Sequence, residues 1–329
     1  MRVRFIAYSH VEALLERLRL YGDLFGPVRG DDGVVRFSPL TSGVRPDFCA
    51  LRTLLPPKKF LLHPTDTILN YTKCGGYQLP TEAERPRILI GLHPCDLAGI
   101  NYLDRIFLGD TPDPLYAVRR SNLTLVGVSC TPDEYCSCHC SPSSLKAAAD
   151  LFFTHVDDGF IISGTSIHGD ELLEGMKDCI ENQDRNVPED TRRFFGHGSS
   201  VPVTPELDAT LPDWQEFADS CLGCGACSVC CPTCSCFNVL EFSGLDGSSA
   251  ERVRQWDNCL FKSHAQVAGG MSFRKNRAER FRYRYRHKYR GFGPLQGFPG
   301  CVGCGRCRVV CPARLDLRPL AMRLEVAVP

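Results

Sequence analysis

One cysteine motif constrains this chain more than any other feature. Residues 221–232 read Cys-Leu-Gly-Cys-Gly-Ala-Cys-Ser-Val-Cys-Cys-Pro, and residues 301–312 repeat the same cysteine spacing. Both copies follow the pattern C-x2-C-x2-C-x3-C-P. Three closely spaced thiolates can each bind one iron of a cubane, whereas the fourth cysteine, ahead of proline, reaches a second cluster. A chain with two such copies is expected to bind two [4Fe–4S] clusters.

The repeat predicts how the ligands are divided. In bacterial two-cluster ferredoxins, the fourth cysteine of each copy binds the cluster of the other copy. The first cluster is expected to take Cys221, Cys224, Cys227 and Cys311, and the second Cys301, Cys304, Cys307 and Cys231. Cys230 stands where the second copy has Val310, so we expect a buried apolar residue there. Two zinc sites are the alternative, but zinc has no use for the third cysteine at this spacing.

Composition narrows the class of protein. The 329 residues suffice for two domains, and a formal net charge of zero argues against a general nucleic-acid binder. The chain holds 20 cysteines, yet its first residues lack the apolar segment of an export signal. No uncharged apolar stretch approaches the length of a membrane span. We therefore expect reduced thiols in the cytoplasm of an oxygen-avoiding cell, and no membrane span.

Residues 1–180 are predicted to form an α/β domain with a small parallel or mixed sheet. The apolar runs Ile88–Leu92 and Leu123–Val128 are typical of buried strands, and Leu97–Phe107 between them of an amphipathic helix with Asp96 as its N-cap. Such a strand–helix–strand unit favours a parallel pair of strands. Further helices are expected at Val11–Leu20, from about Leu145, at Glu171–Ile180 and at Trp214–Ser220. Further strands are expected at Val34–Phe37 and Gly159–Ser163.

Cysteines follow both of the predicted strands. Cys95 comes after the first strand and Cys130 after the second, and Cys136 and Cys138 follow closely. Binding sites in parallel sheets form beyond the carboxyl ends of the strands, so these four residues predict a third [4Fe–4S] cluster. Alternate residues of an extended segment share a face, so Cys140 can replace one of the later ligands. A zinc site or a set of structural thiols is the alternative.

The second domain is predicted over residues 213–329, after a linker at 181–212. We expect a mainly α, ferredoxin-like domain for the two clusters, with a long insertion at 237–300. The cysteines Cys234, Cys236 and Cys259 lie between the two motif copies. They are expected to pack near the clusters or, in one case, to replace a standard ligand. Cys74 has no assigned role.

Residues 273–290 alternate basic and aromatic side chains. One interpretation is nucleic-acid binding through base stacking and phosphate contacts. A second is docking onto an acidic partner, or shielding of anionic clusters. A third is a helix whose aromatic side packs on the cluster domain while its arginine side is solvated. We favour the last two, which are compatible with each other.

Together these features resemble a family of iron–sulfur subunits. It is typified by an iron–sulfur subunit of anaerobic sulfite reductase and by the beta subunit of cytoplasmic NAD(P)-linked nickel–iron hydrogenases, the sulfhydrogenases. A similar subunit occurs in flavin oxidoreductase assemblies that feed heterodisulfide reductase. The resemblance spans about residues 50–320 and rests on Pro56–Phe60, Pro94–Leu97, Cys130 with Cys136–Cys138, Cys221–Cys236, Trp256–Cys259, Ala268–Gly270, Arg277–Arg280 and Cys301–Pro312.

The resemblance implies an electron-transfer component of a hetero-oligomeric complex. Such a component docks a flavin- and NAD(P)-binding reductase subunit, and it exchanges electrons with a catalytic subunit of the hydrogenase, sulfite reductase or heterodisulfide reductase type. No G-x-G-x-x-G follows a predicted strand, so flavin and nucleotide are expected on another chain. The alternative is an enzyme that reduces a disulfide or a sulfur species at its own N-terminal cysteines.

Overall fold

The computed structural model describes residues 3–80, 85–138, 149–181, 214–291, 295 and 298–316. Three sequence-based predictions therefore lie outside the described residues. They concern Cys140, the helix from about Leu145 and, apart from its first residue, the linker at 181–212.

A seven-stranded mixed sheet forms the N-terminal part, as predicted. Its strands stand in the order β1-β9-β8-β7-β6-β2-β3. The inner strands β2, β6, β7 and β8 run parallel to one another, and the remaining neighbours pair antiparallel. The strands are β1 (Val3–Ala7), β2 (Asp23–Arg29), β3 (Val35–Pro39), β6 (Arg87–Leu92), β7 (Leu123–Val128), β8 (Leu151–Val156) and β9 (Gly159–Gly164).

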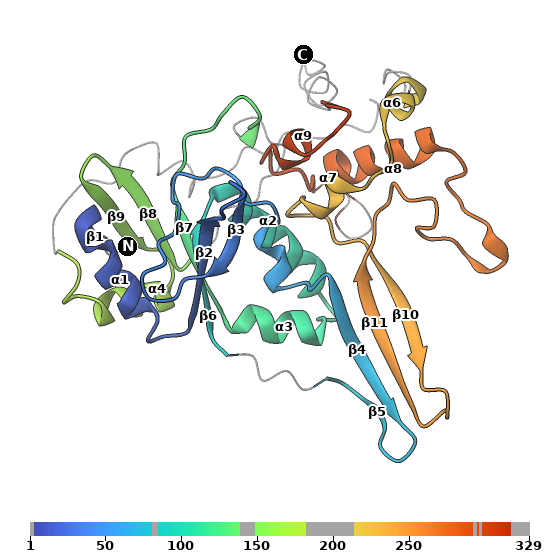
Figure 1. Ribbon diagram of the computed structural model, residues 1–329, viewed down its shortest axis with the longest axis horizontal. Helices are drawn as coiled ribbons and strands as arrows, with labels where there is room; N and C mark the ends of the chain where they lie inside the picture. Colours follow the sequence, from blue (N-terminus) through green and yellow to red (C-terminus); the bar gives the residue numbers. More distant parts are fainter. Residues whose placement is uncertain are drawn as a thin grey trace.

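Helices cover both faces of this sheet (Figure 1). Strand residues alternate between the faces: Ile88 and Ile90 of β6 pack into one apolar core with α1 (Val11–Leu18) and α4 (Ile167–Gly175). Leu89 belongs to the opposite core. That core contains the apolar sides of α2 (Pro94–Phe107) and α3 (Pro114–Ser121). Burial on both faces explains the nearly continuous apolar runs of β6 and β7.

Two helix predictions are corrected. Asp96 is not an N-cap, because α2 begins at Pro94 behind the extended residue His93. Its carboxylate instead pairs with Arg306, as described below. The helix predicted at Glu171–Ile180 instead spans Ile167–Gly175. It begins earlier because the Ser166 side chain accepts a hydrogen bond from the amide of Gly169 and caps it there, and it ends before the predicted Ile180.

A second sheet joins distant parts of the chain. It has the antiparallel order β10-β11-β4-β5. Its strands are β4 (Thr65–Thr72), β5 (Gly76–Gln78), β10 (Phe237–Ser243) and β11 (Ser249–Trp256). The first two precede the large sheet's β6, whereas the last two lie between the cysteine motifs. These strands form an arm that projects from the rest of the molecule (Figure 1).

A buried ion network holds this arm at its base. Asp66 of β4 accepts hydrogen bonds from Arg119 of α3 at 2.7 and 2.8 Å and from Arg254 of β11 at 3.0 Å. The Arg119 and Arg254 side chains are both buried. The network therefore ties the hairpin between the motifs to the N-terminal helices.

The two cysteine motifs pack beside short helices and one long one. The helices are α6 (Trp214–Ser220), α7 (Ala226–Val229), α8 (Arg277–Arg290) and α9 (Arg306–Val309); short 3-10 turns lie at Tyr8–His10, Pro57–Phe60 and Ala268–Gly270. The α8 helix packs on α6 through aromatic contacts, with Phe281 stacked on Phe217. Within the described ranges, we find no helix with the length and apolar character that a membrane crossing needs.

Candidate metal centre

The two motif loops have the same backbone shape. Gly223 and Gly303 have φ of 67° and 66°, and Gly225 and Gly305 have φ of 80° and 73°. Only glycine adopts this left-handed conformation without strain, which explains why both copies read Cys-x-Gly-Cys-Gly. Each second glycine is the N-cap of a four-residue helix, α7 or α9, that carries the third cysteine.

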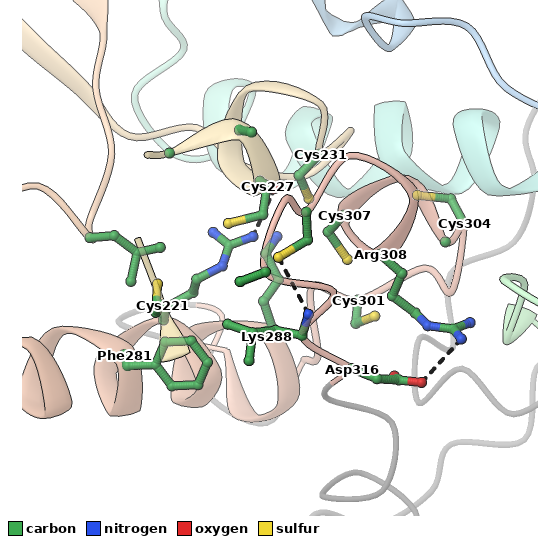
Figure 2. Close-up of a pocket in the computed structure, with 18 of the residues that line it drawn as sticks. Cys221, Cys227, Cys231, Phe281, Lys288, Cys301, Cys304, Cys307, Arg308 and Asp316 are labelled. Carbon is green, nitrogen blue, oxygen red and sulfur yellow. Dashed lines mark hydrogen bonds and ion pairs between the residues drawn. The ribbon is translucent and has the colours of Figure 1, made fainter. Parts of the chain in front are cut away.

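All eight motif cysteines line one cavity between these loops. They are Cys221, Cys224, Cys227, Cys231, Cys301, Cys304, Cys307 and Cys311. Figure 2 shows the sulfur atoms of Cys231, Cys301, Cys304 and Cys307 gathered on one side, with those of Cys221 and Cys227 on the other. Leu260 and Phe281 are among the other residues that line the cavity. Eight thiols in a largely apolar cavity fit two cubane clusters.

The motif spacing favours clusters over single ions. In a cubane each thiolate binds a different iron atom, and the C-x2-C-x2-C-x3-C-P pattern supplies a third cysteine for which a four-thiolate zinc site has no use.

Three cations from distant segments surround Cys231 and Cys234. Buried Arg284 of α8 donates to the Ser228 hydroxyl at 2.5 Å, to the Cys227 carbonyl at 2.8 Å and to the Cys234 sulfur at 3.5 Å. A hydrogen bond from the Cys234 thiol, followed by the charges of Lys288, Arg284 and Lys58, lowers the pKa of Cys231 well below its usual value. These surroundings therefore favour the thiolate form of Cys231, the form that binds iron.

Basic side chains of residues 273–290 thus point toward the cysteine motifs as well as toward solvent. Besides Arg284, Lys288 donates to the Thr233 hydroxyl at 2.6 Å, and Arg277 donates to the Cys221 carbonyl at 2.8 Å. Phe281 and Tyr285, from the same helix, are buried against α6. The arginine side of the helix was expected to be solvated, and for Arg284 that expectation is wrong.

The four N-terminal cysteines come together as their positions predict. Cys95 lies in the first turn of α2, and Cys130 follows β7. A hydrogen bond joins the Cys136 and Cys138 thiols and lowers the pKa of Cys136 to about 6. The same hydrogen bond and burial raise the pKa of Cys138, and the nearby thiols of Cys95 and Cys130 raise it further. The parallel pairing of β6 and β7 places Cys95 and Cys130 at one edge of the sheet.

This N-terminal thiol group lies against the second motif. The amide of Ser137 donates to the Gly303 carbonyl at 2.8 Å. Arg52 donates to the Cys304 carbonyl at 2.8 Å, to the Cys136 sulfur at 3.0 Å and to Asp133 at 2.6 Å. The Cys95 thiol is close enough to Cys304 for the two to influence each other's charge.

A buried ion pair lies beside the same contact. Asp96, next to Cys95, pairs with Arg306 of the second motif at 2.7 Å. Both side chains are almost completely buried. Arg306 also donates to the Thr53 carbonyl at 3.3 Å. Together with Arg52, this pair fixes the N-terminal thiol group to the second motif.

The cysteines between the motif copies also lie near the cavity. The register of β10 and β11 ends with Phe237 opposite Trp256, and just beyond it the Asp257 amide donates to the Cys236 carbonyl at 3.0 Å. A hydrogen bond from the Cys236 thiol lowers the pKa of Cys259 to about 6. Cys230 is buried, as expected for an apolar position. Cys74 is exposed, far along the arm between β4 and β5.

The sequence pattern does not reveal most of the charged residues that lie beside the cysteines. Arg52, Lys58 and Asp96 lie outside any recognised ligand pattern. One signal was available: Arg306 stands inside a motif copy where the other copy has Ala226. A charged residue in an otherwise apolar, buried loop needs an opposite charge nearby, and Asp96 supplies it.

Comparisons with known proteins agree with this geometry. A family model described as a 4Fe-4S dicluster domain matches residues 220–315. Sulfhydrogenase 2 subunit beta of Pyrococcus furiosus is 36% identical over 311 residues, which cover 91% of this chain and 91% of that protein. The chain belongs to the sulfhydrogenase beta-subunit family. No solved structure matches this family member significantly. The dicluster match includes all eight cavity cysteines, so this member of the family is an iron–sulfur subunit.

Proposed function

We propose that this chain relays electrons in the cytoplasm from a flavin- and NAD(P)-binding reductase subunit to a catalytic oxidoreductase subunit, or in the reverse direction. The catalytic subunit would be of the hydrogenase, sulfite reductase or heterodisulfide reductase type. The relative named above is itself a subunit of a sulfhydrogenase, which supports a hetero-oligomeric complex.

This proposal rests on the contacts that connect the three groups of thiols. Cys138 of the N-terminal group packs against Gly303, next to Cys304, and Cys304 lines the same cavity as Cys227 of the first motif. We assign one cluster to Cys221, Cys224, Cys227 and Cys311, a second to Cys301, Cys304, Cys307 and Cys231, and a third to Cys95, Cys130, Cys136 and Cys138. Iron–sulfur clusters, when bound, supply one-electron transfer over a range of potentials.

The residues of the chain would hold and tune these centres. The loop backbone orients the thiolates, and the apolar lining excludes water from the cavity. Lys288, Arg284 and Arg306 place positive charge beside the thiol groups, which favours the reduced, more negative state of a bound cluster. In this proposal the motif cysteines serve as cluster ligands, so the task of the chain is electron transfer and not bond chemistry.

Iron and acid-labile sulfide analysis of the anoxically purified chain tests the assignment. We expect about 12 iron atoms per chain from three four-iron clusters, and about 8 would limit the relay to two. The double substitution Cys95→Ser with Cys138→Ser should lower the iron content by about four atoms and remove one EPR signal of the reduced protein. Cys74→Ser, on the exposed arm, is the control and should change neither.

A further inference from the structure

Two arginines flank the Tyr135 ring where the N-terminal thiol group meets the second motif. The Arg52 guanidinium lies 5.8 Å from the centre of the ring, and the Arg308 guanidinium lies 5.2 Å from it. The two side chains are shielded to the same degree, with 14% and 15% of their surface exposed. They carry the same charge at the same junction, and they differ in what they contact.

Arg52 contacts one assigned ligand from each of two proposed clusters. Its Nη2 atom donates to the Cys136 sulfur at 3.0 Å, and its Nε atom donates to the Cys304 carbonyl at 2.8 Å. The Asp133 carboxylate accepts from both terminal nitrogens, at 2.5 and 2.6 Å. Asp133 also accepts from the amides of Tyr135 and Cys136, which fixes the direction of the guanidinium. A planar guanidinium can donate in all these directions at once, whereas a lysine ammonium is a point charge.

Arg308 binds the same segment through its backbone. It donates to the carbonyls of Glu134 and Tyr135 at 3.0 and 2.8 Å, and it pairs with Asp316 at 3.1 Å. These partners are oxygen atoms. Arg308 therefore anchors the segment, whereas Arg52 both anchors it and reaches the sulfur of an assigned ligand.

The hydrogen bond to the Cys136 sulfur differs from the sulfur contacts of two other assigned ligands. Cys221 and Cys311 accept from nearby backbone amides at 3.4 Å. The bond from Arg52 is shorter and its donor is charged, and hydrogen bonds with a charged donor are roughly twice as strong as neutral ones. Hydrogen bonds to the ligand sulfurs help to set the reduction potential of an iron–sulfur cluster.

We propose that Arg52 is a positioning residue of the third cluster, because it raises the reduction potential of that cluster through the Cys136 sulfur and fixes the cluster against the second one through the Cys304 carbonyl. The inference rests on the proposed relay, and in particular on a cluster bound by the N-terminal thiol group. An electron that arrives on this cluster makes its ligand sulfurs more negative. The N–H donor then stabilises the reduced state more than the oxidised state.

An EPR-monitored redox titration of the anoxically purified chain compares the two arginines. The signal of the third cluster is the one that the double substitution Cys95→Ser with Cys138→Ser removes. Arg52→Gln should keep about 12 iron atoms per chain. It should lower the midpoint potential of that signal by roughly 60 mV, a tenfold change in a one-electron equilibrium. Arg308→Gln removes the same charge from the same junction and should leave the potential unchanged. Equal shifts in the two variants would overturn the role of the hydrogen bond.

A lysine variant separates the potential from folding and cluster assembly. Arg52→Lys keeps the charge but loses the planar donor, so it should recover only part of the shift. Loss of about four iron atoms from both Arg52 variants would show that the residue only holds the site together, and it would overturn the proposal. If Arg52→Gln alone loses iron, a wild-type potential in Arg52→Lys overturns it.

The iron content distinguishes a failure of this proposal from a failure of the relay. A wild-type potential in Arg52→Gln, with about 12 iron atoms per chain, removes the role of Arg52 and leaves the three-cluster relay intact. About 8 iron atoms in the wild-type chain would remove the third cluster, and the role of Arg52 with it.

Discussion

The two cysteine motifs share a spacing and a backbone but not an environment. The second motif is clamped to the N-terminal part by Arg306 and lies beneath Ser137 and Cys138. The first motif is supported by α8, whose Arg284 reaches the Cys227 carbonyl, and its loop is open among the described residues. Local sequence thus determines the shape of each loop, whereas distant segments determine its charge and exposure. Two clusters of one type can acquire different properties in this way.

The largest expected effect concerns the buried ion pair between Asp96 and Arg306, which fixes the second motif to the N-terminal part. Asp96→Ala leaves Arg306 buried without its partner, so we expect a loss of stability of about 3–5 kcal/mol. Anoxic denaturant unfolding would measure this loss. Glu241→Ala removes an exposed ion pair with Arg252 and should cost less than about 1 kcal/mol. Equal losses of stability in the two variants would contradict the idea that the Asp96–Arg306 ion pair is essential.

A matched pair of glycine substitutions separates the effect of backbone conformation on stability from the effect of neighbouring residues. Gly223→Ala and Gly303→Ala both impose a left-handed alanine, which costs roughly 1–2 kcal/mol. At Gly303 the new methyl group also meets the backbone of Ser137 and Cys138 at 2.5 Å, which adds about 1–3 kcal/mol of overpacking. Thermal unfolding of the two holoproteins should rank Gly303→Ala as clearly less stable. The reverse order would show that the N-terminal thiol group does not cover the second loop.

The smallest expected effect concerns the reduction potential of a bound cluster. Arg284→Gln removes a positive charge beside Cys227 and Cys231, so an added electron becomes less favourable. We expect the midpoint potential of at least one cluster to fall by roughly 60 mV, a tenfold change in a one-electron equilibrium. EPR-monitored redox titration would measure it. Arg284→Lys keeps the charge and should restore most of the potential, and Arg286→Gln, on the exposed side of α8, should leave it unchanged. Identical shifts in Arg284→Gln and Arg284→Lys would rule out a charge effect.

Sequence patterns predicted the features that depend on nearby residues. The apolar runs predicted β6 and β7, and their parallel order then placed Cys95 and Cys130 at one sheet edge. The role of Asp96 could not be predicted in the same way, because its partner Arg306 lies 210 positions further along the chain. A local pattern made Asp96 an apparent helix cap, whereas a distant charge determined its actual contact.

The same limit applies to α8 and to the arm. The alternation of basic and aromatic residues predicted a helix with an aromatic side, but not that Arg284 would enter the cysteine motif. Strands β4 and β11 were not predicted, since their half-buried, mixed sequences carry no clear apolar alternation and their pairing links residues 65–72 with 249–255. Such contacts depend on the complete fold.

The small sheet has a consequence for how the chain is made. Strand β4 is synthesised early, but its neighbour β11 follows almost 180 residues later, so its edge stays unpaired until most of the chain has emerged. Unpaired edges invite association with other chains. A fragment that ends before β10 would carry the N-terminal cysteines together with this open edge. The two halves of the protein are therefore poor candidates for exchange as separate modules, whether in engineering or in evolution.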